Sequence, residues 1–178
     1  LIWYGGGKVA LWRGWIGHKH IRKQYVSSSF SKEQTDYLTG CVFLVRSELI
    51  SAVIGFDSYF GLYSEDVDLS MRILNQGSEL WVLPDAHAYH HVSVSSGGEL
   101  SPFKAFYRGR SNALIIKRYT RPWEWLTLIV GGIIGGIALS LKLLIRGKSA
   151  TVSAIWQGIF SGLLGLSIPN KYRLKNSQ

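Results

Sequence analysis

Residues 55–69 of the chain read Gly-Phe-Asp-Ser-Tyr-Phe-Gly-Leu-Tyr-Ser-Glu-Asp-Val-Asp-Leu, and this stretch predicts where a helix begins. Ser64 is a typical N-cap residue, because its hydroxyl can accept a hydrogen bond from a backbone N–H of the first turn. Apolar residues then recur at helical spacing: Val67, Met71 and Leu74. Gly77 favours the left-handed conformation that often follows a helix. We therefore expect one amphipathic helix between Ser64 and Gly77.

Three acidic residues lie within four positions at the start of this helix: Glu65, Asp66 and Asp68. Acidic side chains in a first turn can simply complement the positive end of the helix dipole, which stabilises a helix by about 0.3–1 kcal/mol per residue. Clustered carboxylates also repel one another, so that the pKa of one can rise and suit it to general-base catalysis. Spacing alone leaves both interpretations open and does not say which carboxylate is affected.

The sequence around these acids predicts an α/β fold. Cys41–Val45 and Leu80–Leu83 are short apolar runs typical of buried strands. Between them, a short helix is expected over Ser47–Ile54, capped by its first residue, and the acidic helix follows. After a loop rich in Ser and Gly at residues 93–102, a helical pattern covers Phe103–Tyr119. Strand–helix–strand alternation of this kind favours a layered sheet covered by helices.

Composition limits the class of protein. Of 178 residues, 47% are hydrophobic and 17% charged, and 20 Lys and Arg against 11 Asp and Glu give a net charge of +9. A chain this apolar is not intrinsically disordered. Its single cysteine, Cys41, excludes a disulfide framework and a zinc site built on several thiolates. Few charges with a strong positive excess indicate that apolar and basic residues are concentrated in different places.

The longest apolar stretch predicts a transmembrane helix. No residue in Leu126–Leu141 is charged, and residues 126–145 together are about long enough to cross a ~30 Å hydrocarbon core. Trp123 and Trp125 precede the stretch, where an interfacial aromatic belt would lie, and Lys142 near its end can extend its ammonium to the interface. A buried core helix is the alternative, but the lack of charge and the flanking Trp residues favour the membrane.

A second apolar stretch, residues 152–168, is shorter and richer in Gly and Ser. It predicts either a second transmembrane helix or a helix lying on the membrane surface. Lys and Arg flank both stretches, and by a difference of one charge they favour the cytoplasmic side for the two outer flanks. We expect a cell membrane protein, in the inner or plasma membrane, with its polar part facing the cytoplasm.

Histidines are dense just after the second predicted strand, at His87, His90 and His91. Neutral imidazole is a common metal ligand. Along a strand, however, His87 and His90 would point to opposite faces, so the spacing does not predict a ready-made metal pair. The sequence has no HExxH motif, which argues against a zinc hydrolase.

Four blocks of sequence together resemble the family 2 glycosyltransferases, in particular their rhamnosyltransferase-like members. In chain order they are Thr35–Cys41 (Thr-Asp-Tyr-Leu-Thr-Gly-Cys), Gly55–Asp57 (Gly-Phe-Asp), Glu65–Leu69 (Glu-Asp-Val-Asp-Leu) and Pro84–His90 (Pro-Asp-Ala-His-Ala-Tyr-His). A later element, Tyr-Arg-Gly-Arg-Ser-Asn at residues 107–112, is similar to the Tyr-x-x-Arg-Asn element of that family but has Ser where Asn is usual. The resemblance covers residues 1–121 and implies the GT-A fold.

The resemblance also implies roles for individual residues. Asp66 matches the catalytic base, which removes the proton from an acceptor hydroxyl as that oxygen attacks the anomeric carbon of a nucleotide sugar and inverts its configuration. Gly40 lies where backbone approaches substrate, and Asp57 and Glu65 would line the acceptor side. The acceptor would be a glycan or a lipid-linked sugar, in the synthesis of a surface polysaccharide or another cell-envelope glycan.

Two further roles follow from the same resemblance. His90 matches a histidine that binds a divalent metal, Mg²⁺ or Mn²⁺, which would neutralise the departing diphosphate. Arg110 would contact the diphosphate or a lipid headgroup. At helical spacing Arg110, Lys117 and Arg121 fall on one face, which predicts a basic stripe toward headgroups or a lipid-diphosphate acceptor.

The resemblance predicts two parts in the chain. Residues 1–121 would be the C-terminal, acceptor-side part of a glycosyltransferase domain, and residues 122–178 a membrane-associated helical region. The donor-binding half of the family ends in an Asp-x-Asp metal motif, and no such motif precedes Thr35. Gly5–Lys8 is not a phosphate-binding loop, because the GxxxxGK[ST] spacing is absent. We therefore expect the C-terminal part of a longer enzyme, inactive on its own.

Two other functions compete with this interpretation. A non-catalytic membrane-anchored module that binds glycan or a partner subunit would explain the missing donor half, although the intact Glu-Asp-x-Asp block favours an enzyme. Basic residues between Lys8 and Lys23 alternate with Trp and Tyr, a pattern that also suits single-stranded nucleic acid. The apolar stretches make anionic lipid the preferred partner of these charges, so no nucleic acid is expected.

Overall fold

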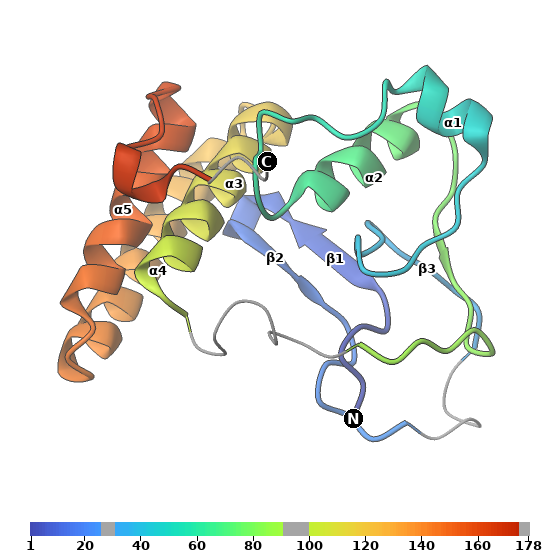
Figure 1. Ribbon diagram of the computed structural model, residues 1–178, viewed down its shortest axis with the longest axis horizontal. Helices are drawn as coiled ribbons and strands as arrows, with labels where there is room; N and C mark the ends of the chain where they lie inside the picture. The colour runs from blue at the N-terminus through green and yellow to red at the C-terminus, as the bar shows by residue number, and fades with distance from the viewer. Residues whose placement is uncertain (26–30, 91–99, 175–178) are drawn as a thin grey trace. The chain divides into compact units, whose positions relative to one another are not determined.

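The structure is a computed structural model that describes residues 1–25, 31–90 and 100–174 (Figure 1). The chain is mixed α/β, with few strands and mostly helices. It divides into two compact units. The first unit comprises Leu1–Ala10, Trp15–Asp57 and the described part of Glu65–Val94; the second comprises Leu11–Gly14, Ser58–Ser64 and the described part of Ser95–Gln178.

The strands of the first unit form two small antiparallel sheets rather than one layered sheet. β1 (Gly7–Ala10) pairs with β2 (Trp15–His18). β3 (Glu33–Gln34) pairs with β4 (Trp81–Val82), which lies inside the predicted strand Leu80–Leu83. The predicted strand–helix–strand sheet is therefore wrong for the described residues.

The predicted strand Cys41–Val45 is also wrong, for a physical reason that the side chains reveal. Phe43 and Val45 pack against the core of the first unit, whereas Val42 and Leu44 are 62% and 95% exposed. The segment thus alternates in and out as a strand does, but no strand in the described part of the chain pairs with its backbone.

Two helices complete the first unit. α1 (Ser47–Ala52) ends two residues earlier than expected, and Arg46, not Ser47, occupies its N-cap position without a side-chain cap. The chain then turns through left-handed residues at Ile54 and Gly55. α2 (Glu65–Asn75) begins directly after Ser64 and is followed by left-handed Gly77, which confirms the predicted helix.

The core of the first unit is formed by Val53, Leu69, Ile73 and Leu80. α2 therefore turns the row of Leu69 and Ile73 inward, with Leu74 partly buried beside it. Met71, which the spacing placed on the buried face, is only half-buried. Val67 is buried as expected.

The second unit is built on three helices: α3 (Pro102–Tyr119), α4 (Glu124–Ile145) and α5 (Ser149–Leu164). α3 confirms the helix predicted from Phe103, and Ser101 caps it by accepting a hydrogen bond from the Lys104 N–H at 3.3 Å. Two single-turn 3-10 helices also belong to this unit: η1 (Leu11–Arg13) lies against α4, and η3 (Asn170–Tyr172) follows α5.

α3 and α5 lie side by side with their backbones almost in contact (Figure 1). A Cβ added to Gly158 of α5 would lie 2.0 Å from the carbonyl oxygen of Phe106 in α3, and one added to Gly162 would lie 2.5 Å from that of Arg110. Gly158 and Gly162 are four residues apart, the spacing of the GxxxG pattern that lets two helices approach closely. Residues around this contact form the core of the unit: Ala105, Phe106, Tyr107, Ala154 and Tyr172.

α4 differs from both of these helices. It has 22 residues, and only 11% of its most apolar 18-residue window is buried. In the described part of the chain it is the one helix long and apolar enough to cross a membrane by length and composition. The 16-residue α5, which overlaps the second predicted apolar stretch, falls short of that length and packs on α3 instead.

Candidate functional site

The segment that follows β3 is fixed to β1 by side chains of its own. Thr35 Oγ1 accepts a hydrogen bond from the Gly7 N–H at 2.6 Å and donates one to the Gly7 carbonyl at 2.9 Å. Asp36 Oδ2 accepts from the Val9 N–H at 2.8 Å. Gly7 must lack a side chain here, because a Cβ would lie 2.3 Å from the ring of Tyr37. Gly7 thus allows a close approach of the two segments, and these contacts hold residues 35–37 against β1.

Asp66 lies in the first turn of α2, directly beside Gly40. The Gly40 N–H donates a hydrogen bond to Asp66 Oδ2 at 2.8 Å, and the Val67 N–H donates to Oδ1 at 2.8 Å. A Cβ added to Gly40 would lie 3.5 Å from the Cβ of Asp66. Two sequence blocks that are separate along the chain therefore meet at this carboxylate, and two backbone donors fix its orientation while it remains partly exposed.

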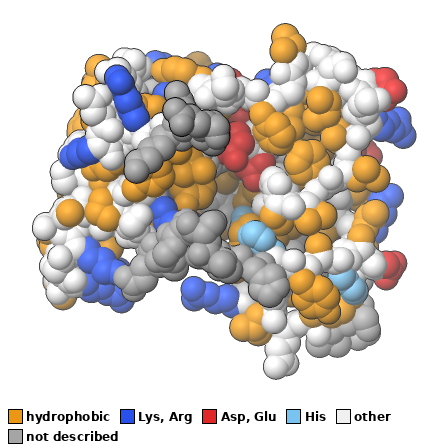
Figure 2. Space-filling model, viewed as in Figure 1, with side chains coloured by type: hydrophobic (Ala, Val, Ile, Leu, Met, Phe, Trp, Pro, Cys, Tyr) orange, Lys and Arg blue, Asp and Glu red, His pale blue; other side chains and the backbone are white. Residues whose placement is uncertain are grey.

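Glu65 precedes Asp66 and has different surroundings. It is half-buried, and its Oε2 is buried with no hydrogen-bond partner among the residues that the structure describes. Burial raises the pKa of the Glu65 carboxyl, and the neighbouring charge of Asp66 raises it further. Acidic side chains gather at this end of α2 on the face drawn in Figure 2. The surroundings of Glu65 thus favour its protonated form.

Asp68 has a structural role. Its side chain is fully buried, and its Oδ2 accepts a hydrogen bond from Arg72 Nε at 2.8 Å. The same guanidinium donates to the carbonyl of Val53, and to the carbonyl of Gly55 at 2.7 Å. The ion pair therefore ties α2 to the turn that follows α1.

Two tyrosines that the sequence did not single out belong to this site. The Tyr4 hydroxyl donates a hydrogen bond to the carbonyl of Tyr37, and the two rings lie 6.1 Å apart. Burial raises the pKa of Tyr4 to about 12 and also raises the pKa of Tyr37, and in both cases the charge of Asp66 adds to the effect. Both phenols therefore remain protonated hydrogen-bond donors at neutral pH. Buried aromatic residues give no spacing signal in a sequence, which is why neither was predicted.

His90 packs against an aromatic cluster in the same unit. Its ring lies 4.7 Å from that of Trp3, and Trp3 also packs edge-on against His18 at 4.7 Å. The backbone around His87 and His90 is not a strand, so the expected alternation of these two side chains is wrong. His87 packs instead against Tyr25, with ring centroids 4.6 Å apart.

The described residues do not by themselves form a metal site. Across residues 1–25, 31–90 and 100–174, no three His, Cys, Asp or Glu side chains gather closely enough to hold an ion. His90 can provide at most one of the ligands that Mg²⁺ or Mn²⁺ needs, and these hard cations prefer oxygen ligands. His91, the third histidine of the run, lies outside the described residues.

The two remaining candidates lie elsewhere. Asp57 is partly exposed, two residues beyond the turn at Gly55. Arg110 belongs to the second unit, where it is 2% exposed. The expected basic stripe along α3 is wrong, because Arg110 is buried, Lys117 Nζ donates to a backbone carbonyl of α5, and Arg121 lies beyond the end of the helix.

Comparison with known proteins gives partial matches. The chain is 28% identical over 116 residues to the N-acetylglucosaminyl-diphospho-decaprenol L-rhamnosyltransferase of Mycobacterium tuberculosis, a match that covers 65% of this chain. It is 36% identical over 65 residues to the rhamnosyltransferase WbbL of Escherichia coli, covering 36% of this chain. Both relatives are rhamnosyltransferases. They support a glycosyltransferase family for this chain.

These matches have limited extent. The chain spans 37% of the length of the M. tuberculosis relative and 25% of the length of the E. coli relative. No family model matches the chain, and no solved structure matches it.

Proposed function

We propose that the chain is part of a membrane-associated inverting glycosyltransferase of family 2 with a GT-A catalytic domain. It would transfer a sugar, with L-rhamnose the first to test, from a nucleotide sugar to a lipid-linked or glycan acceptor in cell-envelope synthesis. The observation on which the proposal rests is the contact of Gly40 with Asp66, which joins two of the sequence blocks at one oriented carboxylate. The names of the two relatives support the substrate class.

Asp66 is the proposed base. Its carboxylate would take the proton of an acceptor hydroxyl while that oxygen forms a bond to the anomeric carbon. The bond from the anomeric carbon to the diphosphate oxygen breaks in the same step, and the nucleoside diphosphate leaves with the electron pair. Attack from the face opposite the leaving group inverts the anomeric configuration. The backbone donors at Gly40 and Val67 would keep the carboxylate aimed before the acceptor arrives.

The neighbouring groups would bind the acceptor. Glu65, whose pKa is raised, can donate a hydrogen bond from its protonated form to an acceptor oxygen. The protonated phenol of Tyr37 is a second donor near Asp66. We propose Asp57 as a further acceptor-side residue, on the resemblance alone.

A divalent cation, Mg²⁺ or Mn²⁺, is proposed as cofactor, with His90 as one ligand. The described residues do not complete such a site, so no step above depends on it. If His90 is a ligand, His90→Ala should change the metal concentration that supports transfer. An unchanged metal requirement would remove His90 from that role.

The decisive variant is Asp66→Asn, assayed in membranes from cells that express the complete gene product. Nucleotide-activated L-rhamnose and a polyprenyl-diphospho-N-acetylglucosamine acceptor would be the substrates. Loss of the base should lower the transfer rate by about 10²–10⁴-fold while acceptor binding is retained. The matched control is Glu48→Gln, which also converts a carboxylate to an amide but at an exposed position on α1. Full activity of Asp66→Asn would overturn the proposed base. If the unmodified gene product binds acceptor but transfers no sugar, the non-catalytic alternative is favoured.

A further inference from the structure

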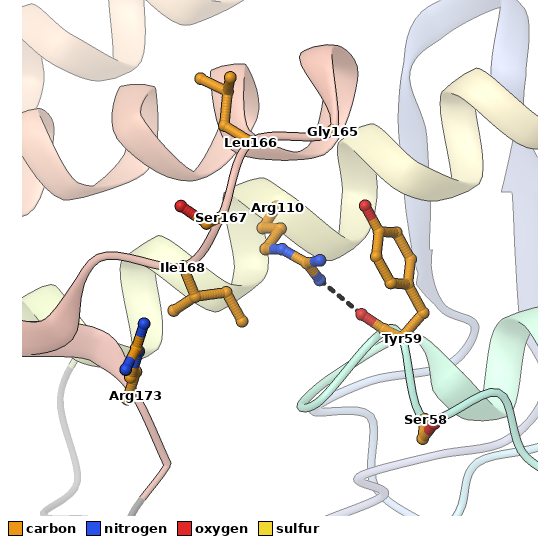
Figure 3. Close-up of a pocket in the computed structure, with 8 residues that line it drawn as sticks. All are labelled: Ser58, Tyr59, Arg110, Gly165, Leu166, Ser167, Ile168 and Arg173. Carbon is orange, nitrogen blue, oxygen red and sulfur yellow. Dashed lines mark hydrogen bonds between the residues drawn. The ribbon is translucent and has the colours of Figure 1, made fainter.

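The second unit contains a cavity of about 380 Å³ at the end of α5 (Figure 3). One wall is the turn Ser58–Tyr59, and the opposite wall is the segment that follows left-handed Gly165. Arg110 of α3 lies between the two walls, and Arg173 lies at the rim (Figure 3). The cavity thus combines two guanidinium groups with apolar side chains, chiefly Leu166 and Ile168.

The buried guanidinium of Arg110 has no anionic partner among the residues that the structure describes. Its Nη1 donates to the carbonyl of Tyr59 at 2.7 Å and to that of Phe60 at 3.3 Å, and its Cζ lies 4.7 Å from the ring centroid of Tyr59. Its Nε is buried with no hydrogen-bond partner among the described residues. None of these contacts neutralises the charge. A buried charge without a counter-ion is costly, and an anion that enters the cavity would remove that cost.

Arg173 gives the cavity a second positive charge. It follows η3, its side chain is exposed, and it forms no ion pair with any residue in the described part of the chain. Guanidinium groups bind phosphate oxygens through paired hydrogen bonds, which makes two of them a suitable set for a diphosphate.

The apolar part of the lining distinguishes the ligand further. Leu166 is 53% exposed and is one of the lining residues, so it offers apolar surface that a hydrocarbon chain can cover. Ile168 continues the same wall (Figure 3). A ligand with an anionic head and a hydrocarbon chain would satisfy both halves of the lining, whereas a free phosphate would satisfy only one.

We propose that this cavity binds the diphosphate of a prenyl diphosphate lipid, with Arg110 and Arg173 on the phosphates and Leu166 and Ile168 against the first hydrocarbon units. The proposal rests on the proposed function, because it assigns residues of the second unit to the lipid-linked acceptor, whereas the proposed base belongs to the first unit. This binding mode differs from the contact of Arg110 with headgroups along an exposed face of α3. Arg110 is buried, so it is not available for such a surface contact.

Calorimetric titration of the full chain in neutral detergent micelles tests the proposal. The probes are farnesyl diphosphate, inorganic pyrophosphate, farnesol and a nucleoside diphosphate. Farnesyl diphosphate should bind more tightly than each of the other three. Arg173→Ala should weaken binding of farnesyl diphosphate about tenfold, since it removes charge-assisted hydrogen bonds from an exposed position where folding is not at risk. Arg146→Ala, an exposed arginine of the same unit outside the cavity, is the matched control.

A second variant separates the apolar contribution. Leu166→Ser should weaken farnesyl diphosphate but leave pyrophosphate unchanged. The proposal is overturned if pyrophosphate or the nucleoside diphosphate binds as tightly as farnesyl diphosphate, if farnesol binds equally well, or if Arg173→Ala has no effect. Binding should survive Asp66→Asn. If the complete gene product transfers sugar but its binding of farnesyl diphosphate does not depend on Arg173, this inference alone is contradicted. If the complete gene product binds the lipid through Arg173 but transfers no sugar, the proposed function alone is contradicted.

Discussion

At the scale of single residues, the acids of α2 are distinguished by what each one contacts. Asp66 accepts hydrogen bonds from two backbone N–H groups, and the buried Asp68 accepts one from the Arg72 guanidinium. One oxygen of Glu65 is buried without a partner in the described residues. The three carboxylates therefore have different surroundings: Asp66 is oriented by backbone donors, Asp68 forms a structural ion pair, and Glu65 favours its neutral form.

The raised pKa of Glu65 predicts how the stability of the fold changes with pH. Between the ordinary glutamate pKa and the raised one, the folded chain binds more protons than the unfolded chain, so stability falls as pH rises through that window. Glu65→Gln removes this ionisation. The variant should have a higher Tm than the parent at neutral pH, and the two should converge at pH values below about 4.

Thermal unfolding followed by circular dichroism across this pH range provides the measurement. Glu48→Gln, which makes the same carboxylate-to-amide change at an exposed position on α1, is the control. A Glu65→Gln curve that runs parallel to that of the parent would show that Glu65 ionises normally in the folded chain.

The sequence predicted part of this site. The Glu-Asp-x-Asp block and the position of Gly40 could be recognised because their residues are close together along the chain. The difference between Glu65 and Asp68 could not be predicted. It depends on burial and on the contact of Arg72 with the turn after α1, and residue spacing gives no information on either. Tyr4 was missed because a single tyrosine in a Gly-rich segment has no pattern of its own.

At the scale of elements, helices were predicted better than strands. α2, α3 and α4 each have periodic or continuous apolar residues and local end signals, so their existence follows from short-range sequence. Cys41–Val45 has the side chains of a strand, yet strand formation needs a partner backbone that local sequence does not specify. The contact of α3 with α5 likewise depends on a partner surface, although its GxxxG spacing was visible in the sequence.

That helix contact makes a prediction at the element scale. Gly158→Ala places a methyl group where the carbonyl of Phe106 now lies, so the two helices must separate. We expect a loss of about 1–3 kcal/mol in the free energy of unfolding, as for other overpacked contacts. Gly131→Ala on α4 is the control, because nothing lies within 4 Å of its added Cβ and alanine has the better helix propensity.

Urea unfolding of the detergent-solubilised chain, with near-ultraviolet dichroism as the signal, compares the two variants. Equal stability of Gly158→Ala and Gly131→Ala would mean that α3 and α5 do not approach as closely as the structure has them.

At the scale of the whole molecule, the apolar and the charged residues have separate places. Of the 22 residues of α4, the most apolar of the described helices, only Leu128 and Leu143 are buried. A helix with apolar side chains on all faces and little of its surface buried is stable in hydrocarbon rather than in water. The positive excess of the chain lies outside the uncharged stretch of α4, in keeping with contact of its flanks with anionic headgroups.

This distribution predicts how the chain partitions. Replacing both Ile134 and Ile137, which are exposed in the middle of α4, with Arg should cost about 5–7 kcal/mol of insertion free energy if α4 spans a bilayer. The variant should move from the carbonate-resistant membrane pellet to the soluble or aggregated fraction. The matched control adds two Arg residues at Ser51 and Ala52, exposed positions of α1 in the first unit, and should stay in the pellet. If α4 only covered a soluble core, two charges on its exposed face would leave the chain folded and its fractionation unchanged, so the pair of variants decides whether the apolar excess belongs to a membrane.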